Sequence, residues 1–315
     1  MSWVQRLWER EELFRRAPSA HNTQPWTVSY AADQVEIGWD PARALPVADP
    51  TRRDLYLGIG AFVETCLIVA ADTGLAVDAE ITADRVRLVP AAVPYPTAFT
   101  ASDVAERRVA RGRYAPGQVP AAVLAELEPG LRHLPTRDLA ADLAAADRWM
   151  FGEPAVTAEL RDWLRLSPRH PRYHLDGLTD RALALTRTEA VLLDGVLRAY
   201  PMGRRLGLPA LLAAGGRGLL RHDGSVLVQV GGDRGPAATI AAGRRLLRTW
   251  LRLARHGLAV HPLSQLIDCP ATAARLAERV GGPPLAVFRV GRPLIEPVRS
   301  ARLPPGAGSA PGRRA

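Results

Sequence analysis

Hydrophobic and polar positions along this chain show two periodicities, one with the roughly 3.6-residue spacing of a helix and one with the two-residue spacing of a strand. They predict helices at 4–16, 119–128, 139–150 and 156–166, and strands at 27–30, 35–39, 86–89, 225–230 and 285–290. The strands at 27–30 and 35–39 are close enough in sequence to form a hairpin. Helices and hairpins in this mixture predict an α+β fold rather than a continuous βαβ series.

Two segments far apart in the chain share one pattern. Residues 60–77 read GAFVETCLIVAADTGLAV, and residues 243–260 read GRRLLRTWLRLARHGLAV. Each begins with glycine in a long helix, and Gly74 or Gly257 stands where that helix ends and a strand begins. Ungapped agreement of these features predicts a structural duplication. The apolar run at 55–71 is interrupted by Glu64 and is shorter than a bilayer span, so we expect a core helix.

Two further segments lie outside the repeat. Residues 168–218 contain several Pro, Gly and His breaks and form a candidate lid or cap. Residues 304–315 are rich in Pro, Gly, Ser and Ala, a composition that cannot bury a core, and we expect a disordered tail.

Composition excludes several chemistries. The net charge is +9, and all 41 basic residues are arginine, because the sequence contains no lysine. Schiff-base, pyridoxal-phosphate and Walker-type mechanisms need a lysine amine and are excluded. The arginines are spread over helices that also carry acids, so no nucleic-acid partner is expected. The first residues lack a secretory signal, so we expect a cytoplasmic protein with no membrane partner, and we interpret Cys66 and Cys269 as buried fillers.

The loop at 17–26, APSAHNTQPW, is the segment richest in hydrogen-bonding side chains. Asn22 is the only asparagine in the chain and stands among Ser19, His21, Thr23 and Gln24. Serine, asparagine and proline are also ordinary turn residues. The residues alone therefore leave two interpretations open, a well-capped turn and a binding site.

This loop resembles the SxxNxQPW signature of the nitroreductase family of FMN enzymes, particularly its long, internally duplicated, twin-module branch. Residues 107–114, RRVARGRY, resemble the phosphate-binding opening RRSxRxF of a nitroreductase module, with Ala110 in place of the serine. HPLSQ at 261–265 is similar to the segment whose proline and following amide face the flavin, and Ser264 and Gln265 replace a frequent Glu-Gly pair. RSARLP at 299–304 is similar to the basic C-terminal stretch that reaches the phosphate.

The resemblance implies a nitroreductase-like fold in which one chain mimics a dimer. It places a first, truncated module at 1–99 and a second at 100–303, with one FMN site between them. The loop expected near 206–210 lacks the signature, so no second flavin is expected. The resemblance implies phosphate binding by arginines, polar contacts from the loop to the ribityl chain and pyrimidine edge, and an amide near Ser264 that donates to flavin N5. The implied cofactor-binding residues are Ser19, His21, Asn22, Gln24, Arg108, Arg111, Pro262, Leu263, Ser264, Arg299 and Arg302.

Other motifs point to no competing site. The glycines at 58–60 and 231–235 do not stand between a strand and a helix as a Rossmann motif requires. His170 and His174 have a proline between them, which favours a surface loop, and no GxSxG elbow is present. No metal site is expected, and no catalytic residue is assigned.

Three functional classes follow from the resemblance. The first is an FMN-dependent oxidoreductase that passes two electrons from NAD(P)H or an organic substrate to a second small molecule. The second is a protein that sequesters FMN with little turnover, and the third is a basic interaction protein with a vestigial site. A monomer that acts as a pseudo-dimer and a homodimer both remain open.

Overall fold

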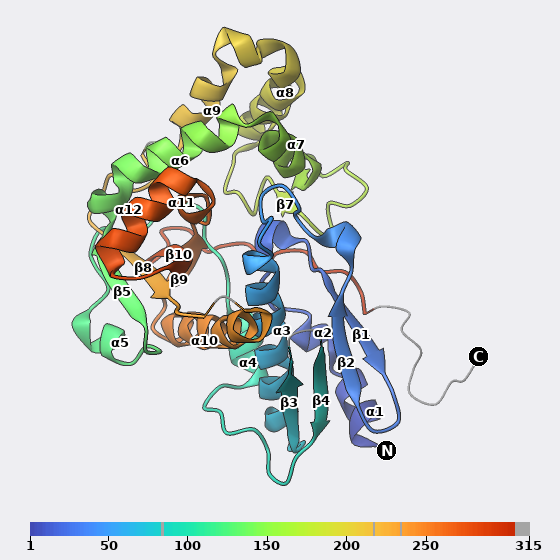
Figure 1. Cartoon of the computed structure of the whole chain (residues 1–315). Coiled ribbons are helices and arrows are strands. Elements are labelled where there is room, and N and C mark those ends of the chain that lie inside the picture. The colour runs from blue at the N-terminus through green and yellow to red at the C-terminus, as the bar shows by residue number, and fades with distance from the viewer. Residues whose placement is uncertain (83–84, 217, 234, 306–315) are drawn as a thin grey trace.

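A computed structural model describes residues 1–82, 85–216, 218–233 and 235–305. The fold is α+β, with two four-stranded antiparallel sheets and a long helix packed on each (Figure 1). Of the tail predicted at 304–315, residues 306–315 lie outside the described part.

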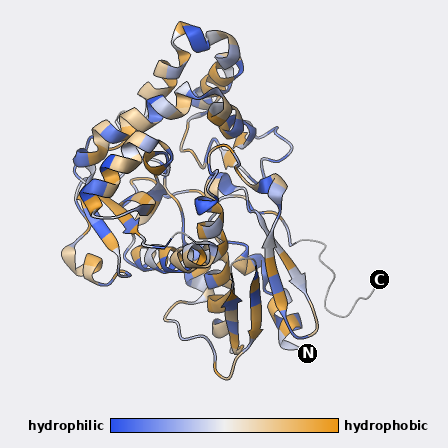
Figure 2. Cartoon of the chain, in the orientation of Figure 1, coloured by the Kyte–Doolittle hydropathy of each residue, from blue (hydrophilic) through white to orange (hydrophobic). Residues whose placement is uncertain are grey.

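The first sheet has the order β1-β2-β4-β3, where β1 is Trp26–Tyr30, β2 is Val35–Trp39, β3 is Val77–Ile81 and β4 is Val86–Pro90. The predicted hairpin is confirmed, with Trp26 opposite Trp39 and Tyr30 opposite Val35. Buried and more exposed positions alternate along β3 and β4. Hydrophobic and hydrophilic residues alternate along the same strands in Figure 2. The buried face packs on helix α3, Arg53–Asp72, and on the short helices α1, Trp3–Trp8, and α2, Glu11–Phe14.

The second sheet has the order β5-β8-β10-β9, where β5 is Leu131–Pro135, β8 is Ser225–Val230, β9 is Ala259–Pro262 and β10 is Pro284–Gly291. The central strands β8 and β10 are buried on both faces, because helices cover each side, whereas the edge strand β5 is partly exposed. One side holds α6, Ala140–Gly152, α11, Gln265–Asp268, and α12, Pro270–Val280. The other side holds α5, Ala121–Ala125, and α10, Pro236–Arg255. The short helix α4, Ala101–Glu106, links the two halves of the chain.

The two halves meet where α3 and α10 cross (Figure 1). A Cβ on Gly60 would lie 2.0 Å from the Ile240 carbonyl oxygen, and a Cβ on Gly243 would lie 2.2 Å from the Leu57 carbonyl oxygen. Only glycine allows the backbones to approach this closely. The buried Glu64 carboxylate, which interrupts the apolar run, is paired with Arg244 of α10 at 2.8 Å. Helix α3 is long and apolar enough to span a membrane, but most of it is buried in this core.

Several predicted boundaries change. The predicted helix at 4–16 is broken at Glu9 and Arg10, although Val4, Leu7 and Phe14 still share one buried face. The predicted helix at 156–166 is α7, Pro154–Asp162, and ends early because Leu164 and Arg165 form strand β6 beside β7, Leu178–Thr179. That parallel pairing is a tertiary contact with no local signal.

Residues 168–218 contain more helix than their Pro and Gly content predicts. Helix α8, Arg187–Gly203, runs through Pro201, and helix α9, Leu208–Gly215, follows after a left-handed turn at Gly207. These two helices form a hairpin that projects from the molecule (Figure 1). The residues before the hairpin, at 168–186, lie against the loop at 17–26 instead.

Candidate functional site

A cavity of about 230 Å³ lies between the two halves of the chain. Its walls come from α3, α10, β10, the β9–α11 connection, the loop at 18–21 and Leu178. Most of the lining is apolar, with Leu57, Leu246, Trp250 and Phe288 among the larger side chains. A mostly apolar cavity with a few polar groups is the usual form of a cofactor site.

A second, smaller pocket of about 40 Å³ adjoins the cavity and shares five of its lining residues, among them Ser19 and Arg111. No Asp or Glu lines it in the described part of the chain. Six arginines do: Arg16, Arg107, Arg108, Arg111, Arg299 and Arg302. Guanidinium groups gathered without carboxylates are suited to a compact anion such as a phosphate group.

The electrostatics of the small pocket favour an anion. Burial lowers the pKa of Arg107 to about 10, with further contributions from Arg108 and Arg16. Burial also lowers the pKa of Arg111 to about 10. Burial, followed by the charge of Arg299, lowers the pKa of Arg108. A bound dianion would supply the compensating charge that the protein itself does not provide here.

Several buried polar atoms at the two pockets have no hydrogen-bond partner. They are His21 Nδ1, Trp250 Nε1 and Arg107 Nη1, which make up three of the six such side-chain atoms among the described residues. Buried polar atoms are normally paired, and unpaired ones indicate an absent partner such as a ligand or water. Burial, with a smaller effect of Arg111, lowers the pKa of His21 to about 4, so its imidazole is neutral near pH 7. A neutral imidazole can both donate and accept a hydrogen bond.

The loop at 17–26 is held in an unusual backbone conformation. His21, Asn22 and Gln24 have positive φ angles of 45°, 55° and 52°. This region is strained for residues other than glycine, and it persists only where surrounding contacts hold it. The Ser19 hydroxyl contributes by accepting from the Gln24 amide at 2.9 Å. Strain concentrated in one loop at a cavity wall is typical of functional sites.

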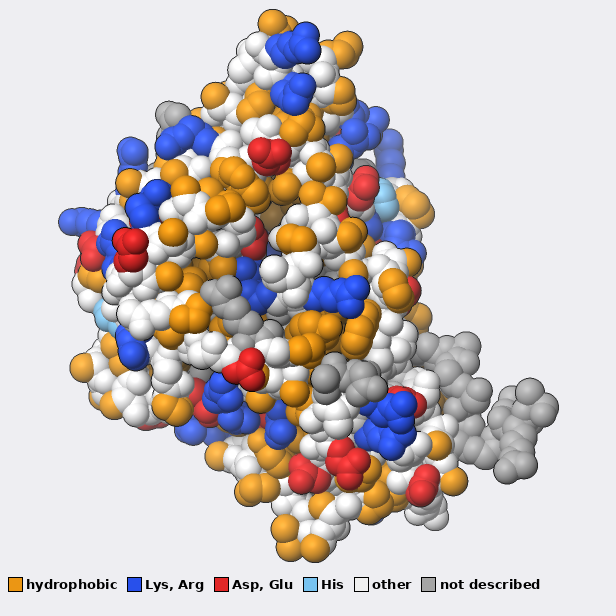
Figure 3. Space-filling view, in the orientation of Figure 1, with side chains coloured by type: hydrophobic (Ala, Val, Ile, Leu, Met, Phe, Trp, Pro, Cys, Tyr) orange, Lys and Arg blue, Asp and Glu red, His pale blue; other side chains and the backbone are white. Residues whose placement is uncertain are grey.

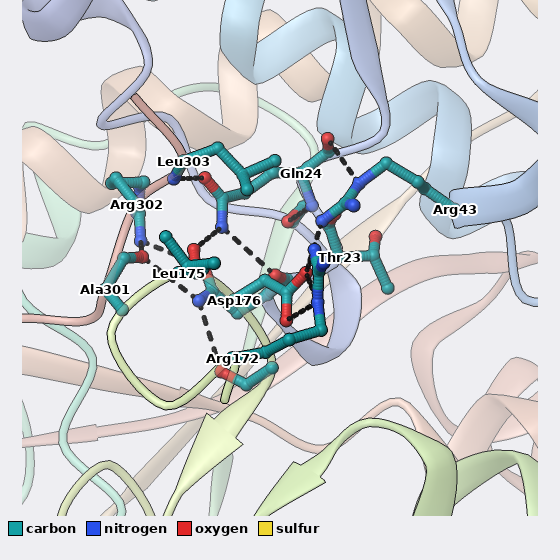
Figure 4. Close-up of polar contacts among 12 residues, drawn as sticks. Thr23, Gln24, Arg43, Arg172, Leu175, Asp176, Ala301, Arg302 and Leu303 are labelled. Atoms are coloured by element: carbon teal, nitrogen blue, oxygen red, sulfur yellow. Dashed lines mark hydrogen bonds and ion pairs between the residues drawn. The ribbon is translucent and has the colours of Figure 1, made fainter. Parts of the chain in front are cut away.

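The side chains of Asn22 and Gln24 hold the loop in place through distant parts of the chain, and Figure 4 shows the contacts of Gln24 with Leu175 and Leu303. Gln24 Nε2 donates to the Leu175 carbonyl at 2.9 Å, and its Oε1 accepts from the Leu303 amide at 2.8 Å. Asn22 Nδ2 donates to the carbonyls of Gly177 and Ala301, each at 3.1 Å. The loop is thereby fixed between the segment at 168–186 and the C-terminal stretch.

A buried carboxylate strengthens the same junction. Asp176 is fully buried and accepts hydrogen bonds from Arg43, Arg165 and Arg172 (Figure 4). Burial alone would raise its pKa, but these three guanidinium groups hold the pKa below its ordinary value. Arg43 Nε also donates to the Thr23 carbonyl at 2.7 Å. The segment at 168–186 is therefore bound to the loop at 17–26 by hydrogen bonds and, through Arg43, by an ion pair.

The residues predicted from sequence fall into three groups. The first group lines the large cavity or the arginine pocket and comprises Ser19, His21, Asn22, Arg108, Arg111, Pro262, Ser264 and Arg299. Within this group, the Asn22 side chain is already engaged by the Gly177 and Ala301 carbonyls and by Arg302. Gln24 and Leu263 line neither pocket, since Gln24 is engaged as described and Leu263 lies in the core beneath α6. Arg302 lines the small pocket, but its five N–H groups donate to the Arg15, Arg16, Ala17 and Ala301 carbonyls and to Asn22 Oδ1.

The β9–α11 connection offers a free backbone donor at the cavity. The Leu263 amide donates to the Val287 carbonyl at 2.8 Å, but the Ser264 amide donates to no other group among the described residues. Ser264 lines the cavity together with Pro262. A free amide at this wall can bind an acceptor atom of a ligand.

The far wall of the cavity carries acids that the sequence patterns did not indicate. Arg53 Nη2 lies 2.7 Å from Asp54 Oδ1 and 2.8 Å from Asp268 Oδ1, and Asp49 is nearby. Burial and the charge of Asp54 raise the pKa of Asp268, and the same two causes raise the pKa of Asp49. The cavity is therefore basic at one end and acidic at the other. Arg16 and Arg107 also line the arginine pocket but were not among the residues implied from sequence, although Arg107 lies within the segment 107–114 and Arg16 directly precedes the loop at 17–26.

Asp147, behind the cavity wall, predicts a pH effect on stability. Burial raises its pKa to about 6, although its Oδ1 accepts a long bond from Gln265. The neutral form is favoured on folding, so this group destabilises the protein as the pH rises from about 4 through 6. Asp147→Asn should therefore raise the free energy of unfolding by about 1 to 2 kcal/mol at pH 8 and leave it unchanged at pH 4, in urea titrations. An equal effect at both pH values would contradict this assignment.

Comparisons with known proteins agree with the geometry. The chain is 25% identical over 328 aligned residues to "Probable NAD(P)H nitroreductase PigM" of Serratia sp., a match that covers 92% of this chain and 89% of that protein. It is also 37% identical over 59 residues to "Putative NAD(P)H nitroreductase MT3217" and "Putative NAD(P)H nitroreductase Rv3131" of Mycobacterium tuberculosis, a match that covers 19% of this chain and 17% of each of those proteins. No protein-family model matches the chain. The similarity along nearly the whole chain supports an oxidoreductase of the nitroreductase type.

Proposed function

We propose that this chain binds one FMN between its two halves and acts as an oxidoreductase of the nitroreductase type. The observation that carries the proposal is the acid-free arginine pocket, which opens directly onto a larger apolar cavity. FMN has the same two parts, a phosphate and a flat ring system. When bound, it supplies two-electron transfer through N5, and the protein supplies orientation and electrostatics.

The phosphate belongs in the arginine pocket. Arg108, Arg111 and Arg299 line it, and Arg107 contributes a buried Nη1 without a partner. Each guanidinium can bind two phosphate oxygens at once. Arg302 and Asn22 support the phosphate site indirectly, because the hydrogen bond of 2.9 Å between them holds the loop at 17–26 beside the pocket.

The ring system belongs in the apolar cavity. Pro262 and the free amide of Ser264 stand at one wall, and His21 and Trp250 present polar atoms without partners. These groups can bind the heteroatoms of the ring and exclude water from it. Ser19 lines both pockets and suits the ribityl chain between them.

In this proposal, the two halves of the chain, 1–99 and 100–303, arose by duplication and form a pseudo-dimer. Three observations support it. The sheets share one strand order, helices α3 and α10 are each 20 residues long, and Gly74 and Gly257 end them with φ angles of 70° and 68°. The crossing of α3 and α10 is also symmetric. Gly60 faces Ile240, three residues before Gly243, and Gly243 faces Leu57, three residues before Gly60.

NAD(P)H is the proposed reductant, since the related proteins are named for it. A small organic molecule would reoxidise the flavin at the cavity face lined by Arg53, Asp54 and Asp268. The alternative is FMN sequestration with little turnover. The ion-paired junction of Asp176 with Arg43 and Arg172 favours this alternative, because it holds the segment at 168–186, whose Leu178 lines the cavity, against the loop.

Visible absorbance of the purified protein, before and after anaerobic addition of NADPH or NADH, tests the proposal. We expect a flavin spectrum whose visible absorbance is lost rapidly after NADPH or NADH is added. A flavin spectrum that persists would favour sequestration. A colourless protein that takes up no added FMN would overturn the proposal.

A further inference from the structure

The hairpin formed by α8, η4 (Arg204–Leu206) and α9 exposes large apolar side chains, and no residue of these helices lines the large cavity or the arginine pocket. Met202 is 82% exposed, Leu206 is 86% exposed and Leu211 is 60% exposed. Val191 and Leu192, farther down α8, are each 67% exposed. Three of these residues lie near the turn between α8 and α9, and exposed apolar side chains gathered at one end of a projecting element are typical of an interaction site.

The same tip is basic. Residues 195–222 contain no Asp or Glu and five arginines. Arg204 and Arg205 are exposed and stand between Met202 and Leu206 in sequence. Arg198, farther down α8, is paired with Asp194 at 2.8 Å. Hydrophobic and basic side chains are both visible at this end of the molecule (Figure 3).

The hairpin presents this surface in a fixed orientation. Its other face is anchored by Ala190, Leu197 and Tyr200, which are buried. The Tyr200 hydroxyl donates to the Phe151 carbonyl of α6 at 2.5 Å. The apolar tip is therefore not a face that could turn inward to complete the core.

We propose that this tip, made of Met202, Arg204, Arg205, Leu206 and Leu211, binds the surface of an anionic lipid bilayer, a partner that the sequence alone did not predict. Apolar side chains interleaved with arginines fit the boundary between acyl chains and charged headgroups. A second copy of this chain fits poorly, because a twofold contact would bring the same arginines together without an acid to pair them. The hairpin projects from the rest of the molecule, so its tip can reach a bilayer without hindrance from other elements (Figure 1).

Co-sedimentation of the full-length protein with lipid vesicles tests the proposal. We expect the protein to pellet with phosphatidylcholine vesicles that contain phosphatidylglycerol and to remain in solution with phosphatidylcholine alone. Added salt should release it, since screening weakens the attraction of arginine to anionic headgroups. The double variants Met202→Glu with Leu206→Glu and Arg204→Glu with Arg205→Glu should each lower the partition coefficient by more than about tenfold.

Matched control variants are Val93→Glu and Arg10→Glu, which change exposed side chains at the opposite end of the molecule and should leave partitioning unchanged. Circular dichroism establishes that each variant is folded, and the salt dependence of the wild-type protein tests the proposal without any variant. Equal pelleting with both vesicle types, or full pelleting of both tip variants, would overturn it. If the protein binds no vesicles but forms a dimer that the Met202→Glu and Leu206→Glu variant dissociates, the tip is a site of protein association instead.

Discussion

Arg111→Met should weaken FMN binding about 100-fold, or by about 3 kcal/mol, while it makes the FMN-free protein more stable. The guanidinium lines both pockets and makes one long hydrogen bond, of 3.3 Å, to the Ala182 carbonyl. Its charge-assisted bonds to a phosphate would be lost in the variant. Burial lowers the pKa of this group to about 10, so its charge opposes folding of the empty protein. Methionine keeps most of the length of the side chain without the charge.

The measurements are fluorescence titration of FMN into the FMN-free protein and urea unfolding of that same protein. The free energy of unfolding should rise by about 1 kcal/mol or more in the variant. Arg302→Met is the matched comparison. Burial lowers the pKa of Arg302 as well, to about 9, but its guanidinium donates five hydrogen bonds within the protein that offset this cost, so its loss should destabilise the FMN-free state. If Arg111→Met binds FMN as tightly as the wild type and lowers stability, Arg111 is a structural residue.

The fold was predictable where one short segment carries the whole signal. The hairpin of β1 and β2 follows from alternation within 26–39, and the strands at 225–230 and 285–290 follow from compact apolar runs. Helix α8 was not predictable, because Gly195, Pro201 and Gly203 each disfavour a helix locally. Pro201 lies near the end of α8, and the burial of Leu197 and Tyr200 outweighs these preferences.

The site was predictable only in part for a related reason. The unusual composition around Asn22 marks the loop at 17–26, and its resemblance to a known signature gives it a role. The atoms that Asn22 and Gln24 contact lie more than 150 residues away, at 175–177 and 301–303, and local patterns hold no information about them. The cluster of Arg53, Asp54 and Asp268 joins two helices from different halves in the same way.

Gly60→Ala should destabilise the protein by more than about 4 kcal/mol and abolish FMN binding. The new Cβ would lie 2.0 Å from the Ile240 carbonyl oxygen and 2.9 Å from the Gly243 Cα atom, both of which are backbone. Helices α3 and α10 would have to move apart, and such overpacking is among the costliest single changes in a core. The same two helices supply Leu57 and Trp250 to the cavity, so their separation would also open it. Urea unfolding and FMN titration measure the two effects.

Gly195→Ala in α8 is the matched control, because a Cβ at this position would meet no atom within 4 Å, and helix propensity alone should then raise stability by about 0.5 to 1 kcal/mol. Gly243→Ala should cost about as much as Gly60→Ala, since its Cβ would lie 2.2 Å from the Leu57 carbonyl oxygen. The double variant should cost less than the sum, because helices already separated by one methyl group leave room for the second. Additive costs, or a mild effect of either change alone, would mean that the crossing is not the close, symmetric contact from which the pseudo-dimer is argued.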